Sequence, residues 1–360
     1  MQLFMVTASS ETAALQGLAT LSKYLFTTGL CMIGVMTVAY LWYTIGTARL
    51  AKQVTRQVQR QRSKDQRVAQ SAKQTAAVAA VDGEGSVATL VRQEVILNEQ
   101  PDGEKPIPLS RSLIAVGRIG TTVGWFAALT LVLSQGLRTI VTGHAPWSNL
   151  FEFSVSFTAA LLLCYLLFEA RFHERVRAWG LYVCLLSVVT LVIAIYVGTT
   201  YNLITGSSQL IPALQDQPIL TLHVSMAIFA YALFSVAFGT GLIILLQGGS
   251  GQRIAWLPSA EAADELGYKA VIIGFPLLAL NLILGAYWAN YAWGHFWSWD
   301  PKETSALITW LIYAVYLHAR GIRGWRGKRI GWLLVIGFAA TLFTYYGVSF
   351  LVPSLHSYAK

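Results

Sequence analysis

Long apolar runs constrain the fold of this chain more than any other feature of its sequence. Hydrophobic side chains make up 55% of the 360 residues and charged side chains only 12%, whereas about a quarter of the residues in a soluble domain are charged. A helix of roughly 20 apolar residues crosses a bilayer core and satisfies its own backbone hydrogen bonds there. The sequence therefore predicts an all-α, polytopic membrane helix bundle of about eight transmembrane helices. The apolar runs cover residues 24–45, 117–137, 151–168, 179–197, 219–246, 270–287, 304–318 and 330–351.

Basic residues predict the orientation of the bundle, because short loops rich in Lys and Arg stay on the cytoplasmic side. The segments after the first, third and seventh runs are rich in arginine, whereas residues 198–218 contain no Lys or Arg. Both chain ends are therefore expected on the non-cytoplasmic face. The net charge of +9 then reflects topology and contact with the lipid bilayer rather than binding of nucleic acid, for which no motif is present.

Composition divides the chain into three parts. We expect residues 1–47 to form the first transmembrane helix, residues 48–112 a polar cytoplasmic insert, and residues 113–360 a seven-helix membrane domain. Within the insert, residues 49–74 are expected to extend the first helix, before a disordered segment or weak hairpin around Asp82 and Gly83. The three cysteines all fall within apolar runs and form no C-x-x-C spacing, which excludes a c-type cytochrome and a dithiol enzyme.

Residues 293–303 form a tryptophan-rich motif, W-G-H-F-W-S-W-D-P-K-E, directly before the apolar run that ends at His318. It contains three tryptophans, Trp293, Trp297 and Trp299, and three charged residues. Indole rings are large, rigid and flat with one polar N–H, which suits either the bilayer interface or a planar aromatic ligand. The motif by itself leaves both interpretations open.

The expected topology divides the six histidines between the two membrane faces. Those expected on the outer face are His144, His223, His295 and His356. His173 falls in a cytoplasmic loop, and His318 lies about 27 Å along a helix from Asp300, near the cytoplasmic side. A histidine at a membrane edge is commonly a hydrogen-bonded interfacial side chain, but imidazole is also an axial ligand of haem iron. Since His223 and His356 bracket the tryptophans, they could supply both axial ligands to one haem on an aromatic wall.

Five ordered segments extend the pattern beyond single residues. They are residues 143–152 (GHAPWSNLFE), 212–215 with 223–226, the motif 293–304, residues 316–320 (YLHAR) and residues 355–358 (LHSY). In these segments the chain resembles the tryptophan-rich, WWD-motif haem-handling proteins of cytochrome c biogenesis, and among them the CcsA/ResC type of system II in its cyanobacterial and plastid form. The resemblance covers nearly all of the chain outside residues 51–108.

That resemblance implies a function. The chain would be the haem transport and presentation subunit of a system II cytochrome c synthase, a haem lyase complex that attaches haem b to apocytochromes c on the non-cytoplasmic side. It would work with a ResB-like membrane subunit, in a cyanobacterial or plastid thylakoid membrane or in a bacterial plasma membrane. Thiolates of a C-x-x-C-H segment in the apocytochrome would attack the haem vinyl groups, so the synthase contributes orientation rather than a catalytic side chain.

The resemblance also implies roles for individual residues. His223 and His356 would be the outer axial ligands of the haem iron, and His318 a transmembrane ligand that receives haem from the cytoplasmic side. The other haem-binding residues would be Trp293, Gly294, Trp297, Trp299 and Asp300 of the motif. His295 falls at a variable position of the motif and carries no ligand role, and His144 is assigned a structural one.

Three other functions are compatible with about eight helices. A b-type electron-transfer cytochrome would pair histidines across helices within the membrane, and two such pairs are missing from the sequence. A multi-span transporter would favour spans that are broken by Gly or Pro and carry buried carboxylates, which are almost absent. A CcmC-like haem delivery protein is the nearest alternative, but that type is shorter, with about six spans, so length and the last two segments favour the CcsA type.

Overall fold

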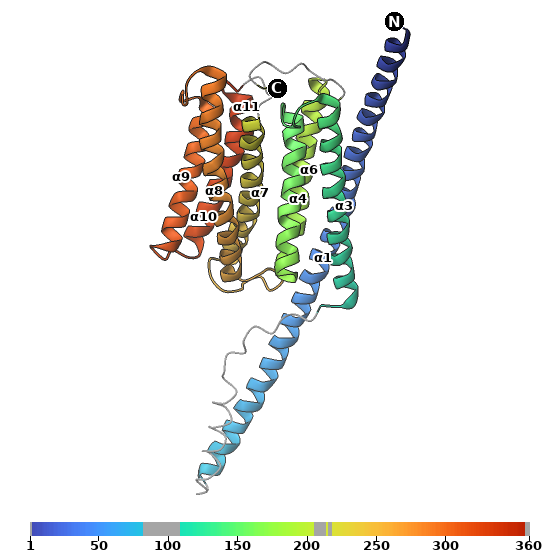
Figure 1. Cartoon of the computed structure of the whole chain (residues 1–360). Helices are drawn as coiled ribbons and strands as arrows, with labels where there is room; N and C mark the ends of the chain where they lie inside the picture. Colours follow the sequence, from blue (N-terminus) through green and yellow to red (C-terminus); the bar gives the residue numbers. More distant parts are fainter. Residues whose placement is uncertain (1, 82–108, 205–213, 215–217, 357–360) are drawn as a thin grey trace.

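The computed structural model describes residues 2–81, 109–204, 214 and 218–356, and these residues form a helix bundle without a β-strand (Figure 1). The helices are α1 (Gln2–Val81), α3 (Arg111–Thr142), α4 (Leu150–Phe172), α5 (Glu174–Arg177), α6 (Gly180–Thr200), α7 (Pro218–Leu246), α8 (Ala260–Trp293), α9 (Pro301–Gly321), α10 (Lys328–Leu342), the π-helix η2 (Phe343–Gly347) and α11 (Val348–Leu351). Each apolar run of the sequence falls on one of these helices or on the continuous segment from α10 to α11. The predicted all-α membrane bundle is therefore confirmed.

Seven helical segments are long and apolar enough to span a membrane within the described residues. They are formed by α1, α3, α4, α6, α7, α8 and the continuous segment Lys328–Leu351. Helix α9 is not among them because its first turn is polar and only one side of the helix is apolar. It nevertheless packs along α8 and α10. The predicted number of about eight thus corresponds to seven apolar spans and the amphipathic α9. The chain is a multi-pass membrane protein.

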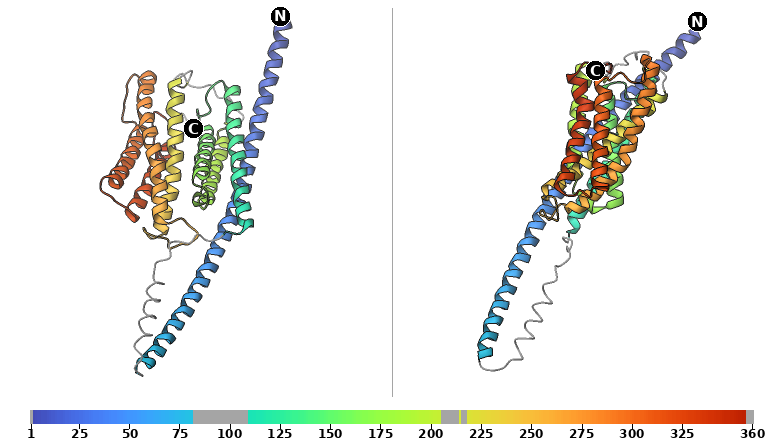
Figure 2. Two further views of the ribbon diagram at one scale, coloured as in Figure 1. Left: turned by 60° about the horizontal axis from the view of Figure 1, so that its bottom comes forward. Right: turned by 90° about the vertical axis from the view of Figure 1, so that its left-hand side faces the viewer.

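Two groups of helices meet at the centre of the bundle. Helices α1, α3, α4 and α6 pack together in one group, α7, α8, α9 and α10 form the other, and α4 packs against α7 between them (Figures 1 and 2). Helices α4 and α7 are accordingly the most enclosed, with 83% and 78% of their most apolar segment buried. A helix that is apolar on all sides is expected in such a central position.

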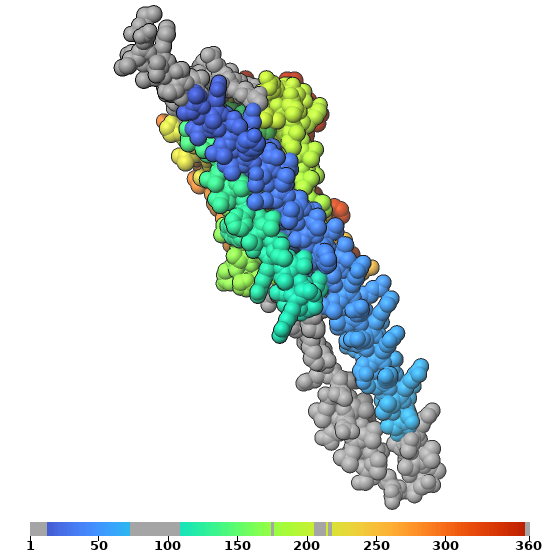
Figure 3. All heavy atoms as spheres, turned by 90° about the vertical axis from the view of Figure 1, so that its right-hand side faces the viewer, coloured from blue at the N-terminus to red at the C-terminus, as the bar shows by residue number. Residues whose placement is uncertain are grey.

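Helices α1 and α3 lie side by side and cover one face of the bundle (Figure 3). Helix α1 then continues past the bundle, as expected for residues 49–74, and the described side chains of that extension are mostly exposed (Figure 1). The start of α1 and the end of α11 lie at the same end of the bundle, in agreement with the expected topology. The turn predicted around Asp82 and Gly83 falls outside the described residues.

A buried polar cluster fastens α1 to the bundle at the opposite end. The carboxylate of Glu169, near the end of α4, accepts hydrogen bonds from Nε of Arg177 at 2.8 Å and from the hydroxyl of Tyr40 at 2.7 Å. Glu169 is only 2% exposed, and a buried charge is costly unless it is paired and hydrogen-bonded. Because Tyr40 belongs to α1, the cluster fixes that helix against α4.

Candidate functional site

A cavity of about 470 Å³ lies at the end of the bundle where α8 ends and α9 begins. Its walls come from residues 143–150, the start of α7, the second half of α8, the first turns of α9, the end of the last span and the residues that follow α11. This volume lies in the usual range of about 300–1,000 Å³ for small-molecule sites. Both outer histidines expected to bind a ligand line this one cavity, together with two motif tryptophans. These residues are His223, His356, Trp293 and Trp297.

Contacts with α8 fix the ring of His223, in the second turn of α7. Nδ1 of His223 lies 2.8 Å from the backbone carbonyl oxygen of Asn281. Nδ2 of Asn281 also lies 3.0 Å from Nδ1, but the carbonyl contact is shorter and a carbonyl can only accept, which favours the tautomer with the proton on Nδ1 and the lone pair on Nε2. The side-chain amide of Asn281 donates in return to the carbonyl oxygen of His223 at 2.9 Å. Gly285 makes room for the ring, because a Cβ at that position would lie 2.6 Å from Cε1 of His223.

A carboxylate fixes the ring of His356, after the end of α11. Nδ1 of His356 lies 2.9 Å from Oδ2 of Asp300. Burial lowers the pKa of His356 below its ordinary value, although the hydrogen bond with Asp300 opposes this effect. The pKa of Asp300 is also lowered, since burial is outweighed by hydrogen bonds from His356 and from the backbone N–H groups of Leu355 and Lys302. A neutral imidazole that donates from Nδ1 to a carboxylate presents its Nε2 lone pair as a metal ligand does.

An aromatic wall accompanies the two imidazoles. Trp288 on α8 is 2% exposed, and its ring centroid lies 6.5 Å from that of His223 and 6.2 Å from that of His356. Trp293 packs edge to face against Trp288 at 4.8 Å and against His356 at 5.0 Å between ring centroids. Trp297 also lines the cavity. Each indole offers a flat apolar face to a planar aromatic ligand, although the planes of Trp288 and Trp293 are inclined by 72°.

Trp299 occupies a different position from the other motif tryptophans. Its side chain is 69% exposed, it is absent from the cavity lining, and it packs edge to face on Trp297 with ring centroids 5.7 Å apart. Trp299 therefore contacts the wall from outside.

The motif folds as the end of one helix and the start of the next. Gly294 ends α8 with a φ of 79°, in the left-handed region that favours glycine, and its N–H bonds to the carbonyl of Asn290 at 3.0 Å. Asp300 is the N-cap of α9 and forms a capping box with Glu303, with Pro301 at the first helical position. Neither Gly294 nor Asp300 lines the cavity. Instead, Gly294 ends the helix that carries Trp293, and Asp300 holds His356 by a hydrogen bond.

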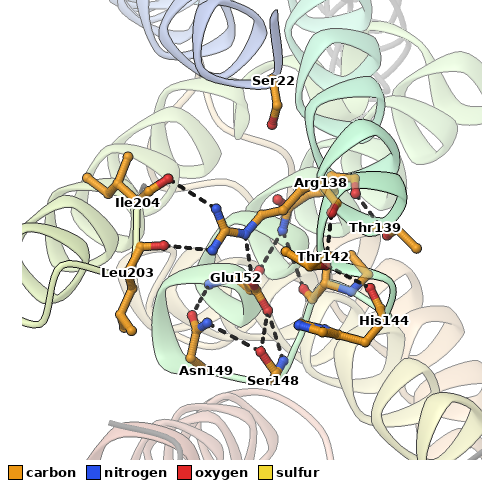
Figure 4. Close-up of polar contacts among 12 residues, drawn as sticks. Ser22, Arg138, Thr139, Thr142, His144, Ser148, Asn149, Glu152, Leu203 and Ile204 are labelled. Atoms are coloured by element: carbon orange, nitrogen blue, oxygen red, sulfur yellow. Dashed lines mark hydrogen bonds and ion pairs between the residues drawn. The ribbon is translucent and has the colours of Figure 1, made fainter. Parts of the chain in front are cut away.

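A buried ion pair holds the opposite wall. Arg138 of α3 pairs through Nε with Glu152 of α4 and donates to the carbonyl oxygens of Leu203 at 2.6 Å and Ile204 at 3.1 Å (Figure 4). Glu152 is 1% exposed and also accepts from the backbone N–H of Ser148 at 3.0 Å and from its hydroxyl at 2.7 Å. Three segments of the chain are thereby joined beside the cavity.

The segment held by this ion pair carries His144. Its Nδ1 lies 3.0 Å from the carbonyl oxygen of Ala145, and the residue lines the cavity. The structure thus brings a third outer histidine to the cavity.

The other two predicted positions lie apart from this cavity. His318 is exposed near the end of α9, and its side chain shares a helix face with the exposed Ile308, Leu311 and Val315. The capping Asp300 and His318 are at opposite ends of α9, so His318 does not reach the outer histidines. His295 is exposed and absent from the cavity lining.

Several residues of the site were not singled out from the sequence. Asn281 and Gly285 interrupt an apolar run one turn apart, and Trp288 follows on the same helix. The sequence did offer a signal here, because a polar side chain in a membrane span needs a partner and a glycine on the same face lets another helix approach closely. Their partner His223 is more than fifty residues away in sequence, which the pattern did not indicate.

The fold and the cavity define a class: a multi-pass membrane protein with imidazole and tryptophan rings lining one cavity at the end of its bundle. The sequence profile of the family described as Cytochrome C assembly protein matches residues 147–356, from the wall after α3 to His356. The chain therefore belongs to the cytochrome c assembly protein family.

Individual relatives agree with this membership. The cytochrome c biogenesis protein CcsA of Guillardia theta is 34% identical over 263 residues, which is 66% of this chain and 84% of the relative. The protein of the same name from Prochlorococcus marinus is 37% identical over 262 residues, covering 64% of this chain and 81% of the relative. That from Gloeobacter violaceus is 33% identical over 295 residues, covering 67% and 86%.

Proposed function

We propose that this chain is the haem-handling membrane subunit of a cytochrome c synthase and that it holds haem b between His223 and His356. The observation that carries the proposal is that both imidazoles line one cavity and that Nδ1 of each is hydrogen-bonded, which favours a lone pair on Nε2. Imidazole nitrogens in this state are the usual axial donors to haem iron. Family membership and the CcsA relatives support the assignment to cytochrome c biogenesis in a thylakoid or plasma membrane.

In this function haem is the substrate, and the chain supplies position. Two axial imidazoles hold the iron, Trp288, Trp293 and Trp297 support the ring face, and the vinyl edge stays accessible to an apocytochrome c. The attacking groups are the thiolates of the apocytochrome. Cys31, Cys164 and Cys184 lie on helices within apolar runs, and none lines the cavity. The contribution of the chain is thus catalysis by orientation.

A second site, at the cytoplasmic end, completes the proposed path. His318 lies on an exposed apolar face of α9, which leaves room for a second ligand from another chain. A ResB-like membrane subunit packed on this face would supply it. Haem would then enter between the two subunits and move to the outer cavity, where it meets the apocytochrome.

Absorption spectroscopy of the purified complex tests the outer site. We expect a spectrum of six-coordinate, bis-histidine haem in the wild type, its loss in His223→Ala and His356→Ala, and partial recovery when imidazole is added. His295→Ala is the matched control, because that outer histidine is exposed and away from the cavity. Wild-type spectra in both ligand variants would contradict the assignment.

The order of the two sites needs a separate measurement. His318→Ala should empty the outer site in cells, whereas haem added to the purified variant should restore bis-histidine ligation there. Normal outer-site haem and normal cytochrome c assembly in His318→Ala would rule out the proposed path.

A further inference from the structure

Only one Lys or Arg side chain lines the cavity among its described lining residues, and it is Lys302. Burial lowers the pKa of its ammonium group to about 8, although the neighbouring Asp300 opposes this effect. Its Nζ approaches the hydroxyl of Ser349, at 3.5 Å. Within the described part of the chain Lys302 forms no ion pair. A cation held in a mostly apolar cavity is costly unless an anion accompanies it.

The neighbouring carboxylates are already committed to other donors. Glu303 accepts through Oε2 from the backbone N–H groups of Ser298 at 2.9 Å and Asp300 at 3.2 Å. Asp300 accepts through Oδ1 from the N–H of Leu355 at 2.6 Å, and through Oδ2 from Nδ1 of His356. Both carboxylates therefore organise the backbone and a ligand histidine.

The position of Lys302 on its helix also attracts an anion. Lys302 lies in the first turn of α9, one residue after Pro301. The first turn of a helix has a partial positive charge, which favours acidic side chains and disfavours Lys. Asp300 and Glu303 already accept from the backbone N–H groups at this helix start, so an anionic group entering from the cavity would pair with the ammonium group of Lys302 itself.

We propose that Lys302 binds a propionate carboxylate of haem and thereby fixes which edge of the porphyrin faces α9. This inference rests on the proposed function, since it names the haem edge that this wall recognises. Propionates are the charged groups of haem, and they lie on the edge opposite the vinyl groups. Lys302 would therefore select for the carboxylates and turn the vinyl edge away from α9. A lysine acts on a carboxylate as a point charge with three donors.

A pair of porphyrins tests the proposal on the purified full-length protein. The probes are iron protoporphyrin IX and its dimethyl ester, which keeps the iron, the ring and the vinyl groups but has no propionate charge. We expect the wild type to bind the free acid about 10- to 100-fold more tightly than the ester, as for hydrogen bonds between charged groups. Lys302→Met should lose that preference and keep a bis-histidine spectrum, whereas Lys302→Arg should retain the preference.

Lys269→Met is the matched control, because Lys269 is 38% exposed near the other end of α8 and pairs with the exposed Glu265. It should discriminate between the porphyrins as the wild type does. Equal binding of acid and ester by the wild type would overturn the proposal even if Lys302→Met did not fold, and so would undiminished preference in Lys302→Met. Either result together with haem loss in His223→Ala would leave the proposed function standing, whereas wild-type haem binding in both histidine variants would overturn that function itself.

Discussion

Asp300 and His356, 56 residues apart in sequence, share a hydrogen bond of 2.9 Å between Oδ2 and Nδ1. The same carboxylate caps α9 and accepts from the backbone of Leu355. One motif residue thus couples the start of a helix to the orientation of an outer histidine. Asp300 does not line the cavity, so in the proposed function it would act on haem through His356.

Replacement of Asp300 should weaken haem binding through His356. In Asp300→Asn the carboxylate charge is lost, so the Nδ1–H of His356 has a weaker acceptor. Outer-shell partners of metal-binding histidines typically contribute about 10- to 100-fold in affinity, and we expect a loss of that size in haem titrations.

Ser259→Ala separates this effect from the loss of a helix cap. Ser259 caps α8 at the other end of the bundle by accepting from the N–H of Ala262. It should lower thermal stability slightly and leave haem affinity unchanged. Equal haem affinity in Asp300→Asn and the wild type would show that the hydrogen bond does not matter for ligation.

Gly285→Ala should displace His223. The added Cβ would lie 2.6 Å from Cε1 and 2.8 Å from Nδ1 of the ring, distances that require the ring or α8 to move. We expect a bis-histidine spectrum to be lost or reduced at normal protein levels. Gly34→Ala in α1 is the matched control, because nothing lies within 4 Å of a Cβ there. If both alanine variants bind haem equally, Gly285 has no role in seating the ring.

The sequence predicted the features of this protein that depend on local composition. Apolar runs located the helices because a membrane span is long and uniformly apolar, and charges in the loops predicted which ends share a face. The two outer histidines and Trp293 come together as expected. Each of these predictions required only the type of a residue and the membrane face on which it lies. None required knowledge of the contacts between particular helices.

Features that depend on the register between helices could not be predicted in this way. The contact of His223 with Asn281 follows from how α7 and α8 pack. Trp297 lines the cavity whereas Trp299 does not, and this difference depends on the backbone at Trp299, which has a φ of 59° and leaves its side chain 69% exposed. Trp288 was hidden in an apolar run, where an indole is not distinctive.

The stability of the haem-free protein should depend on pH through His356. Burial lowers the folded-state pKa of His356 below the ordinary value of about 6.5. Between these two values the unfolded chain binds more protons than the folded chain, so the free energy of unfolding falls as the pH is lowered through this window. Above the window the contribution is fully present.

Thermal unfolding in detergent at a series of pH values measures this effect. His356→Gln should flatten the part of the profile that begins as the pH falls below about 6.5, while His295→Gln, which alters an exposed histidine, should reproduce the wild-type profile. A profile of His356→Gln identical to that of the wild type would contradict the assignment of a buried neutral imidazole.

The stability of the cavity wall that carries His144 should depend strongly on the ion pair between Arg138 and Glu152. Arg138→Met would leave Glu152, which is 1% exposed, as an unpaired buried charge, and breaking such a pair costs about 3–5 kcal/mol. We expect a lower midpoint of thermal unfolding and weaker haem binding, because residues 143–149 line the cavity. Adding Glu152→Gln to Arg138→Met should recover part of the stability by removing the buried charge. Lys269→Met breaks an exposed pair, worth about 0–1 kcal/mol, and should change little; an Arg138→Met variant as stable as this control would show that the wall is held by other contacts.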